Sequence, residues 1–227
     1  SLLEANGIAS KRVVTAMPGP SVFTKKIKMA KAPLAELFTN IQFEAGNFIP
    51  HNIDAVKLDY HVIGQSGKNQ IDVLVVAVKN EIIDSFNDCF GLAGLEVAVV
   101  DVDYFALQNM FELGYPEQSQ KTVALINIGA RYSSINICKN GDSLFTGDIS
   151  IGGKSLSDEL AENLGVPFKE AENLKRLKEQ KNPNYGPARE LIDREVEHLA
   201  LELNRQLSFF WNASGSEEVI DRIMLCG

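Results

Sequence analysis

The order of the expected strands and helices predicts an α/β protein with two lobes and a small inserted module. Apolar strands alternate with helices over 71–113, the pattern of a parallel sheet with crossover helices. Over 121–150 the strands follow one another directly, and helices and a final strand come after them. A strand, a helix and a second strand near the start form a separate α+β unit. We therefore expect a first lobe made of 1–19 and 66–118, a module at 20–65, and a second lobe at 119–227.

The composition is that of a globular protein with an acidic surface. The 227 residues suffice for a buried core, and 45% of them are hydrophobic. The net charge of −8 argues against nucleic acid and anionic lipid as direct partners. No apolar run is long enough to span a membrane, and the start lacks the features of a signal peptide. The missing initiator Met and the apolar end make the chain look like a fragment of a longer protein.

The cysteines and histidines do not predict a metal site. The three cysteines lie in separate apolar stretches, so we expect buried free thiols in a reducing cytoplasm. The three histidines have no partner at the spacing of metal ligands. These residues are Cys89, Cys138 and Cys226, and His51, His61 and His198.

In the first part of the chain, apolar runs and turn signals predict each element in order. A buried strand at 12–17 ends at a Pro-Gly-Pro turn, and a strand with one wet face follows at 21–29. Pro33 opens a helix, as proline does at a first helical position. A further strand is expected at 55–64. The apolar stripe of the helix consists of Leu34, Leu37, Phe38, Ile41 and Ala45.

Two nearly continuous apolar runs then predict strands that are buried on both faces of a parallel sheet. They cover 71–78 and 95–102, and neither run has a polar face. A helix to about residue 93 separates them, and a helix at 103–113 follows the second run. Asp103 is a candidate N-cap for that helix, because its side chain can accept from the first N–H groups.

The second part of the chain begins with a meander of strands, expected at 121–128, 132–140 and 142–150. Asn140-Gly141 between the last two strands is the strongest short signal for a β-hairpin. The helices and the strand that follow complete the order of a ribonuclease-H-like unit.

Helix signals follow this meander. Gly152-Gly153 opens a helix to about residue 164, and Pro167 begins another that runs to about residue 178. A long helix covers 188–211, and a last strand covers 219–226. One face of the long helix is apolar, and it is formed by Ile192, Val196, Leu199, Leu203, Leu207 and Phe210.

The turn after residue 128 has two interpretations. Taken alone, Asn-x-Gly between two strands is most often a plain hairpin. Taken with Gly152-Gly153 further along the chain, it is typical of a phosphate cradle, in which backbone N–H groups bind an anion. A glycine in the turn permits φ > 0 and a close approach to the backbone. The peptides that would form the cradle are those of Gly129, Ala130, Arg131, Tyr132 and Ser133.

Several segments together resemble the actin-like ATPase superfamily, which includes actin and the cell-division protein FtsA. Within it, the resemblance is closest to PilM, a family of cytoplasmic actin-like proteins of type IV pilus assembly. The resemblance covers nearly the whole chain, and it implies an actin-like fold that holds ATP or ADP with Mg²⁺ between two lobes. The segments are VVTAMPGPSVFTKKIKM, LFTNIQFEAGNFIP, AVKLDYHVIG, LEVAVVDVDYFALQNMFE and the turn INIGARYSS with its later double glycine.

This resemblance assigns roles to residues beyond the turn. It places Gly152 and Gly153 at a helix N-terminus that favours an anion, with strand-to-helix punctuation as the alternative. It implies that Glu172 and Lys175 reach the ribose and adenine, with an exposed ion pair as the alternative. Gly227 is similar to the first glycine of the loop on the adenosine side.

The residues expected to act in hydrolysis are incomplete. The superfamily usually has aspartate where this chain has Asn127, and an amide cannot take up a proton usefully, so we expect binding to survive better than hydrolysis. Alternatively, Asn127 hydrogen-bonds its own turn. Asp103 and, more weakly, Asp101 are candidates for positioning the attacking water. The superfamily's N-terminal Asp-x-Gly loop would precede residue 1, so we expect this chain alone to bind nucleotide poorly.

The module is expected to bind a partner. Leu37, Phe38, Ile41 and Phe48 could form one wall of a peptide groove, although most of this stripe is expected to be core. The resemblance implies that the groove holds the cytoplasmic tail of a PilN-type membrane protein through apolar anchors and main-chain contacts. Other pilus platform proteins, motor ATPases and a second copy of the chain are further expected partners. The protein would then be cytoplasmic and peripheral to the inner membrane.

The sequence leaves alternative functions open. The best supported is a nucleotide-binding scaffold of the type IV pilus platform or of related type II secretion, because the quoted segments match it in order. The second is an active ATPase or a small-molecule kinase, against which Asn127 and the module argue. The third is a filament-forming divisome protein similar to FtsA.

Overall fold

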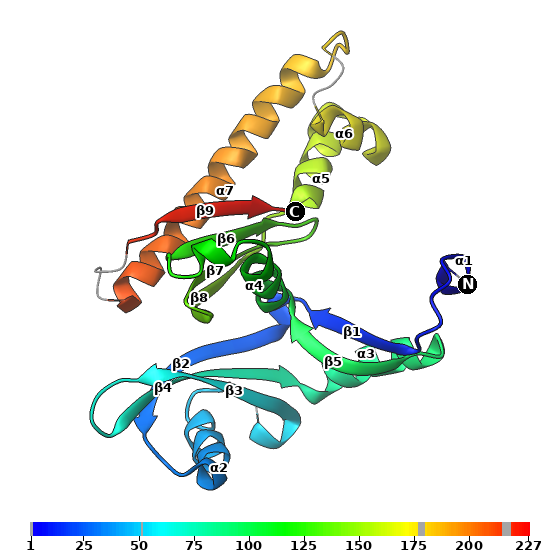
Figure 1. The fold of residues 1–227 in the computed structure, drawn as a ribbon. Helices are drawn as coiled ribbons and strands as arrows, with labels where there is room; N and C mark the ends of the chain where they lie inside the picture. The colour runs from blue at the N-terminus through cyan, green and yellow to red at the C-terminus, as the bar shows by residue number, and fades with distance from the viewer. Residues whose placement is uncertain (1, 51, 177–179, 215–218) are drawn as a thin grey trace. The chain divides into compact units, whose positions relative to one another are not determined.

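The computed structural model describes residues 2–50, 52–176, 180–214 and 219–227, which form two compact units (Figure 1). Unit 1 ends at Met110 and unit 2 begins at Phe111, inside helix α4 (Asp103–Gly114) and before the lobe boundary expected near residue 118. The expected extents of the lobes and the module stay predictions. The two units are described separately below.

The small module in unit 1 is a three-stranded antiparallel sheet covered by one helix (Figure 1). The strand order is β2-β4-β3, and the sheet therefore extends past residue 65 to include β4. β4 was expected in a parallel sheet, and that expectation is wrong. One face of its apolar run, with Ile71, Val73, Val75 and Ala77, packs in the core beneath the helix, and Leu74 and Val78 on the opposite face are buried as well. The bounds are β2 Val22–Ala30, α2 Leu34–Ala45, β3 Val56–Gln65 and β4 Gln70–Lys79.

The core of the module lies between α2 and one face of the sheet. Alternate residues of β2 point to this core, as the period of two in its sequence predicts. Lys26 and Lys28 alternate with these residues and lie on the opposite face, where Lys26 forms an ion pair with Asp72 at 3.0 Å. Lys25 shares the side of the core residues, and its Nζ lies 4.6 Å from the ring centre of Phe48. The buried residues of the core are Met29, Leu37, Ile41, Ala45, Ile49, Leu58, Ile71, Val73, Val75 and Ala77.

The remainder of unit 1 contains a second, smaller sheet. β1 (Arg12–Met17) and β5 (Glu96–Val102) pair in parallel, and α3 (Asn80–Leu92) precedes β5. β1 was expected to be a buried strand and β5 to be buried on both faces, but Val14 is 71% exposed and Val99 is 51% exposed. The parallel pairing is confirmed and the burial is not. A short helix, α1 (Leu2–Ala5), lies near the N-terminus.

Unit 2 is built on a four-stranded sheet with the order β8-β7-β6-β9 (Figure 1). The first three strands form the expected antiparallel meander, and β9 pairs in parallel with β6. Asn140 and Gly141 both have positive φ, as a tight hairpin between β7 and β8 requires. The bounds are β6 Val123–Ile128, β7 Ser133–Lys139, β8 Asp142–Ile149 and β9 Arg222–Cys226.

The helices of unit 2 are α5 (Gly153–Leu164), α6 (Phe168–Lys175) and α7 (Tyr185–Ser214). Leu203, Leu207 and Phe210 of α7 pack on the central strands of the sheet. The start of α7 packs against α5 and α6 around a second cluster. Val196 was expected on the buried face, but it is exposed. The predicted end of the helix after Pro167 falls at 177–179, outside the described residues.

The cysteines differ from expectation in their burial. Cys89, Cys138 and Cys226 are free thiols, but only Cys138 is buried. Burial raises the pKa of Cys138 to about 12, with a smaller contribution from the negative charge of Glu112. In the described part of the chain, no helix has the length and apolarity that crossing a membrane requires.

Candidate functional site

The turn between β6 and β7 is closed by its own backbone. The N–H of Gly129 donates to the carbonyl of Tyr132 at 3.1 Å. A Cβ atom on Gly129 would lie 2.7 Å from that carbonyl oxygen, so a side chain at this position would force the turn to open. Glycine is therefore required by close packing inside the turn.

The start of α5 packs directly on this turn. The N–H groups of Gly153 and Lys154 donate to the carbonyls of Gly129 and Ala130, at 2.9 Å and 2.7 Å. A Cβ atom on Gly152 would lie 2.7 Å from the same Ala130 oxygen. The turn and the first turn of the helix thus hold each other in place.

This packing changes which amides are available to an anion. The first N–H groups of α5 donate to the turn, and the Gly152 N–H donates to the Ser155 hydroxyl at 3.2 Å. The expectation that Gly152 and Gly153 offer free N–H groups is therefore wrong for this structure. The N–H groups of Ala130 and Arg131 donate to no residue that the structure describes, and both residues are exposed. These two amides are therefore available to donate to a ligand.

The other residues predicted for the cradle support the turn. The hydroxyl of Ser133, which is fully buried, donates to the Ile151 carbonyl at 2.8 Å and ties β7 to the segment before α5. Tyr132 contributes the carbonyl that closes the turn. We interpret both residues as supports of the turn, and a direct contact with phosphate stays a prediction for each.

β9 brings the C-terminal residues of the chain beside the turn. Cys226 lies opposite Asn127 in the parallel pairing with β6, and its Sγ is 3.8 Å from Asn127 Oδ1. Burial raises the pKa of Cys226, so it stays a thiol that can donate weakly to this oxygen. Gly227 has φ +144°, and a Cβ atom there would overlap the Ile128 carbonyl. The structure thus places Asn127 and Gly227 at the same edge of the sheet.

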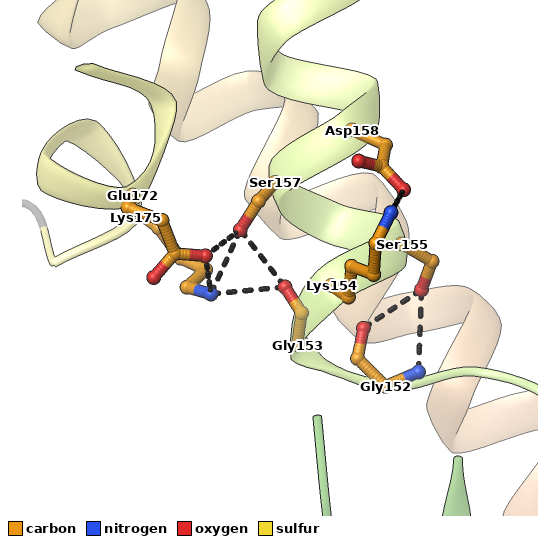
Figure 2. Close-up of polar contacts among 8 residues, drawn as sticks. All are labelled: Gly152, Gly153, Lys154, Ser155, Ser157, Asp158, Glu172 and Lys175. Carbon is orange, nitrogen blue, oxygen red and sulfur yellow. Dashed lines mark hydrogen bonds and ion pairs between the residues drawn. The ribbon is translucent and has the colours of Figure 1, made fainter. Parts of the chain in front are cut away.

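Glu172 and Lys175 meet the start of α5 through a buried serine (Figure 2). Lys175 Nζ donates to the Gly153 carbonyl at 2.9 Å, to Ser157 Oγ at 2.8 Å and to Glu172 Oε1 at 2.6 Å. The Ser157 hydroxyl also contacts Glu172 Oε1 and lies 2.9 Å from the Gly153 carbonyl. The pair is therefore more than an exposed ion pair, because it joins α6 to α5.

The hydrogen bonds of this network change the acidity of Glu172. The hydrogen bond from Lys175 lowers the pKa of Glu172, and the bond from Ser157 lowers it further. Ser157 was not among the residues predicted from the sequence. Its spacing was the available signal, since a residue four positions after Gly153 lies on the same helix face.

A second lysine lies at the exposed edge of α5. Lys154 forms an ion pair with Asp158 at 2.5 Å, and its Nζ lies 5.7 Å from the ring centre of Phe168. The charge of Lys154 is thus paired with Asp158, whereas Arg131, which is exposed in the turn itself, adds positive charge next to the two unpaired amides. Such charge favours the binding of a phosphate group.

Asp101 and Asp103, which lie in unit 1, have local hydrogen-bond partners. Asp103 Oδ1 accepts from the N–H of Gly19 at 3.2 Å and of Tyr104 at 2.7 Å. It therefore joins the turn after β1 to the start of α4, and its role as an N-cap stays a prediction. Asp101 accepts from the N–H of Val102 at 2.7 Å and from Asn109 Nδ2 at 3.3 Å. A role in positioning water stays a prediction for both residues.

The predicted partner residues separate into core and surface. Leu37 and Ile41 are 3% and 0% exposed in the module core, so their assignment to a peptide groove is corrected. Phe48 stacks on Phe23, with ring centres 6.0 Å apart, and is partly buried. Phe38 is 41% exposed and is the residue of this set that a partner can reach.

The described residues do not fit a protein-bound Mg²⁺ ion. Mg²⁺ prefers carboxylate and water oxygens. At the turn the chain supplies the amide of Asn127, whose oxygen faces the Cys226 thiol. In the parts of the chain that the structure describes, no group of three or more His, Cys, Asp or Glu side chains can hold a metal ion.

Known proteins resemble this chain in sequence and in fold. The family model for type IV pilus assembly protein PilM matches residues 1–227. The solved structure of the PilM-PilN type IV pilus biogenesis complex is similar with a TM-score of 0.83 and 24% identity. That match covers 98% of this chain and 65% of the other chain.

Two curated relatives match a shorter part of the chain. They are the ethanolamine utilization proteins EutJ of Salmonella typhimurium (strain LT2) and Salmonella typhi, each 29% identical over 129 residues. The match covers 55% of this chain, which spans only 42% of the length of either relative.

The fold and the turn define the class: this is an α/β protein with the actin-like fold, as the sequence predicted. The chain belongs to the family of type IV pilus assembly protein PilM.

Proposed function

We propose that this protein is a cytoplasmic nucleotide-binding scaffold of the type IV pilus assembly platform, and that it binds ATP or ADP at the turn of residues 129–133. The observation that carries the proposal is the pair of exposed amides of Ala130 and Arg131, which have no described protein partner. A phosphate oxygen accepts from such neighbouring N–H groups and gains the positive charge beside them.

Each part of the site has a role in this proposal. The Gly152-Gly153 step permits the close packing that fixes the turn. Glu172 keeps Oε2 outside its network, so that oxygen can accept from a ribose hydroxyl (Figure 2). Gly227 lies on the adenosine side. Asn127 carries no charge and takes up no proton usefully, so we expect binding with weak or absent hydrolysis.

The proposed partner is the cytoplasmic tail of a PilN-type membrane protein. The solved PilM-PilN complex, whose fold this chain shares, supports this choice. Phe38 supplies an exposed aromatic anchor on the module, as peptide recognition requires. Such a partner would hold the protein at the inner membrane. Contacts with other platform proteins, with motor ATPases or with a second copy belong to the same proposal.

The experiment is calorimetry with two ligands and two variants of the full-length protein. ATP, with and without Mg²⁺, and a synthetic PilN-type tail peptide are titrated into wild type, Arg131→Ala and Phe38→Ala. We expect Arg131→Ala to weaken ATP binding about tenfold, the typical value of a charge-assisted hydrogen bond, and to leave the peptide unaffected. Phe38→Ala should do the reverse.

The two variants act as controls for each other because each changes a different site. Wild type that binds neither ligand contradicts the proposal as a whole. Brisk ATP turnover without peptide binding contradicts the scaffold function and favours an enzyme. An equal loss of both ligands in one variant indicates unfolding, which circular dichroism of the same sample detects.

A further inference from the structure

Lys175 has every donor of its side chain in use. An ammonium group has three N–H donors, and Lys175 donates hydrogen bonds to Gly153, Ser157 and Glu172 (Figure 2). The side chain is 23% exposed, so the network is partly shielded from water. A nucleotide can take a hydrogen bond from Lys175 only if one of these bonds breaks.

Ser157 is the central residue of this network. It is fully buried, and its oxygen accepts from Lys175 while its proton reaches either Glu172 or the Gly153 carbonyl. A hydroxyl is suited to this position because it is both donor and acceptor. Without it, Lys175 would keep an unpaired proton and Glu172 would lose its second partner.

The network continues into the turn through the backbone of Gly153 and Lys154. The carbonyl of Gly153 accepts from Lys175, and the N–H of the same residue donates to Gly129. The next N–H, that of Lys154, donates to Ala130. An unbroken series of hydrogen bonds therefore runs from α6 through Ser157 and the first turn of α5 to the phosphate-binding amides.

We infer that Ser157 is a positioning residue of the proposed nucleotide site. Its hydroxyl holds Lys175 and Glu172 against the start of α5, and this start fixes the Ala130 and Arg131 amides for phosphate. The inference rests on the proposed function, and it adds that the ribose side and the phosphate side are coupled through one buried hydroxyl.

The test uses Ser157→Ala and Ser157→Thr in the full-length protein, with Ser208→Ala as the matched control. Ser208 makes the same type of bond within its helix, to the carbonyl four residues earlier and also at 2.9 Å, but it is exposed and outside the network. Ser157→Cys is a third variant at this position, since a thiol fills a similar space and hydrogen-bonds poorly.

The first readout needs no ligand. ¹⁵N–¹H NMR spectra should show shifted amide signals for Ala130 and Arg131 in Ser157→Ala and Ser157→Cys. The same signals should keep their wild-type positions in Ser157→Thr and Ser208→Ala. A serine that only stabilises its own helix would leave the turn signals in place in every variant, and that result overturns the inference.

The second readout is the affinity for ATP and for inorganic tripolyphosphate, which lacks the ribose. We expect Ser157→Ala and Ser157→Cys to weaken both ligands about tenfold, and Ser157→Thr to restore both. Because Ser157 acts through Lys175, Ser157→Ala added to Lys175→Met should cause no further loss. Additive losses in the double variant contradict the inference.

The two readouts separate the inference from the proposed function. If wild type binds neither ATP nor tripolyphosphate, the proposed function fails and the role in nucleotide binding fails with it. If wild type binds both and folded Ser157→Ala binds them equally well, the inference alone fails.

Discussion

The carbonyl oxygen of Ala130 lies where a side chain on Gly152 would have to be, and this contact sets the geometry of the candidate site. The contact is between backbone atoms, which cannot move aside as the end of a flexible side chain can. The same oxygen accepts from Lys154, so a displacement would also break the bond that joins the turn to α5.

We therefore predict that Gly152→Ala destabilises unit 2 by about 1–3 kcal/mol, the usual cost of overpacking. Urea unfolding followed by circular dichroism measures the free energy of unfolding. Gly91→Ala is the control, because its Cβ atom would meet nothing within 4 Å on α3. The control should be neutral or slightly stabilising, since alanine is the better helix former. Equal effects in both variants would show that the close contact is unimportant.

Glu172 gives a prediction for the dependence of stability on pH. Its folded pKa lies below the ordinary value of 4.5, chiefly because Lys175 donates to it. Its contribution to stability is therefore present above pH 4.5 and is lost as the pH falls through the folded pKa. Wild type should be more stable than Glu172→Gln at pH 7, and the difference should shrink below pH 4.5.

Urea unfolding of both proteins between pH 7 and pH 3 measures this difference. Glu162→Gln is the matched control, since Glu162 is exposed on the neighbouring helix α5. A difference for Glu172→Gln that stays constant across this range would exclude the titration of Glu172 as its cause.

At the scale of elements, α2 shows how one apolar stripe serves two purposes. Ile41 is completely buried in the module, whereas Leu34 on the same helix is 84% exposed. The spacing of apolar residues places both on one stripe, but it does not reveal how far the sheet beneath the helix extends. The sequence therefore predicted the helix correctly and could not separate its core residues from its surface residues.

Ile41→Ala should destabilise the module by about 2–5 kcal/mol, because it removes buried methyl groups and leaves a cavity. Leu34→Ala should change the free energy of unfolding by less than about 0.5 kcal/mol, as is usual for exposed positions. Guanidinium unfolding monitored by circular dichroism compares them. If the Leu34 variant were the less stable of the two, the packing of α2 would be different from the one described.

In other elements too, features set by neighbouring residues were predicted, and features set by residues far away in the sequence were not. The hairpin at Asn140-Gly141 follows from its two residues alone, and the structure confirms it. The partners of β4 were predicted wrongly, because an apolar run indicates burial but not the direction of the neighbouring strands. The exposure of β1 and β5 has a related cause, since burial depends on which elements cover the sheet.

At the scale of the whole molecule, the fold class was predictable because many weak patterns occur in one order. The site was predictable in part. The glycine motifs at Gly129, Gly152 and Gly153 directed attention to this turn, and their binding of phosphate stays a prediction. The hydrogen bonds that occupy the α5 amides depend on how closely the two glycine segments pack. Ser157 was missed because its role depends on a lysine from another helix.

The proposed nucleotide site lies in unit 2 and the module lies in unit 1, so the effect of ATP on the two units can be compared in the whole chain. Saturating ATP, at about a hundred times its Kd, should stabilise the structure that binds it by about 2.7 kcal/mol. Hydrogen exchange by mass spectrometry should then show slower exchange at the turn of residues 129–133 and at α5. The module strands β2 and β3 should exchange at an unchanged rate. Protection confined to the module would place the nucleotide elsewhere.

The saturated ammonium group of Lys175 also has a consequence for chemical labelling. An ammonium group reacts with an acylating reagent only after it loses a proton and exposes a lone pair. All three N–H groups of Lys175 are hydrogen-bonded within the protein, so its nitrogen is held away from the reagent. Lys154, on the same helix start, is 56% exposed at its side chain. In a footprinting experiment Lys154 should be acylated quickly and Lys175 slowly, at the rate of local opening between α5 and α6. The labelling rate of Lys175 therefore measures how often α6 separates from α5.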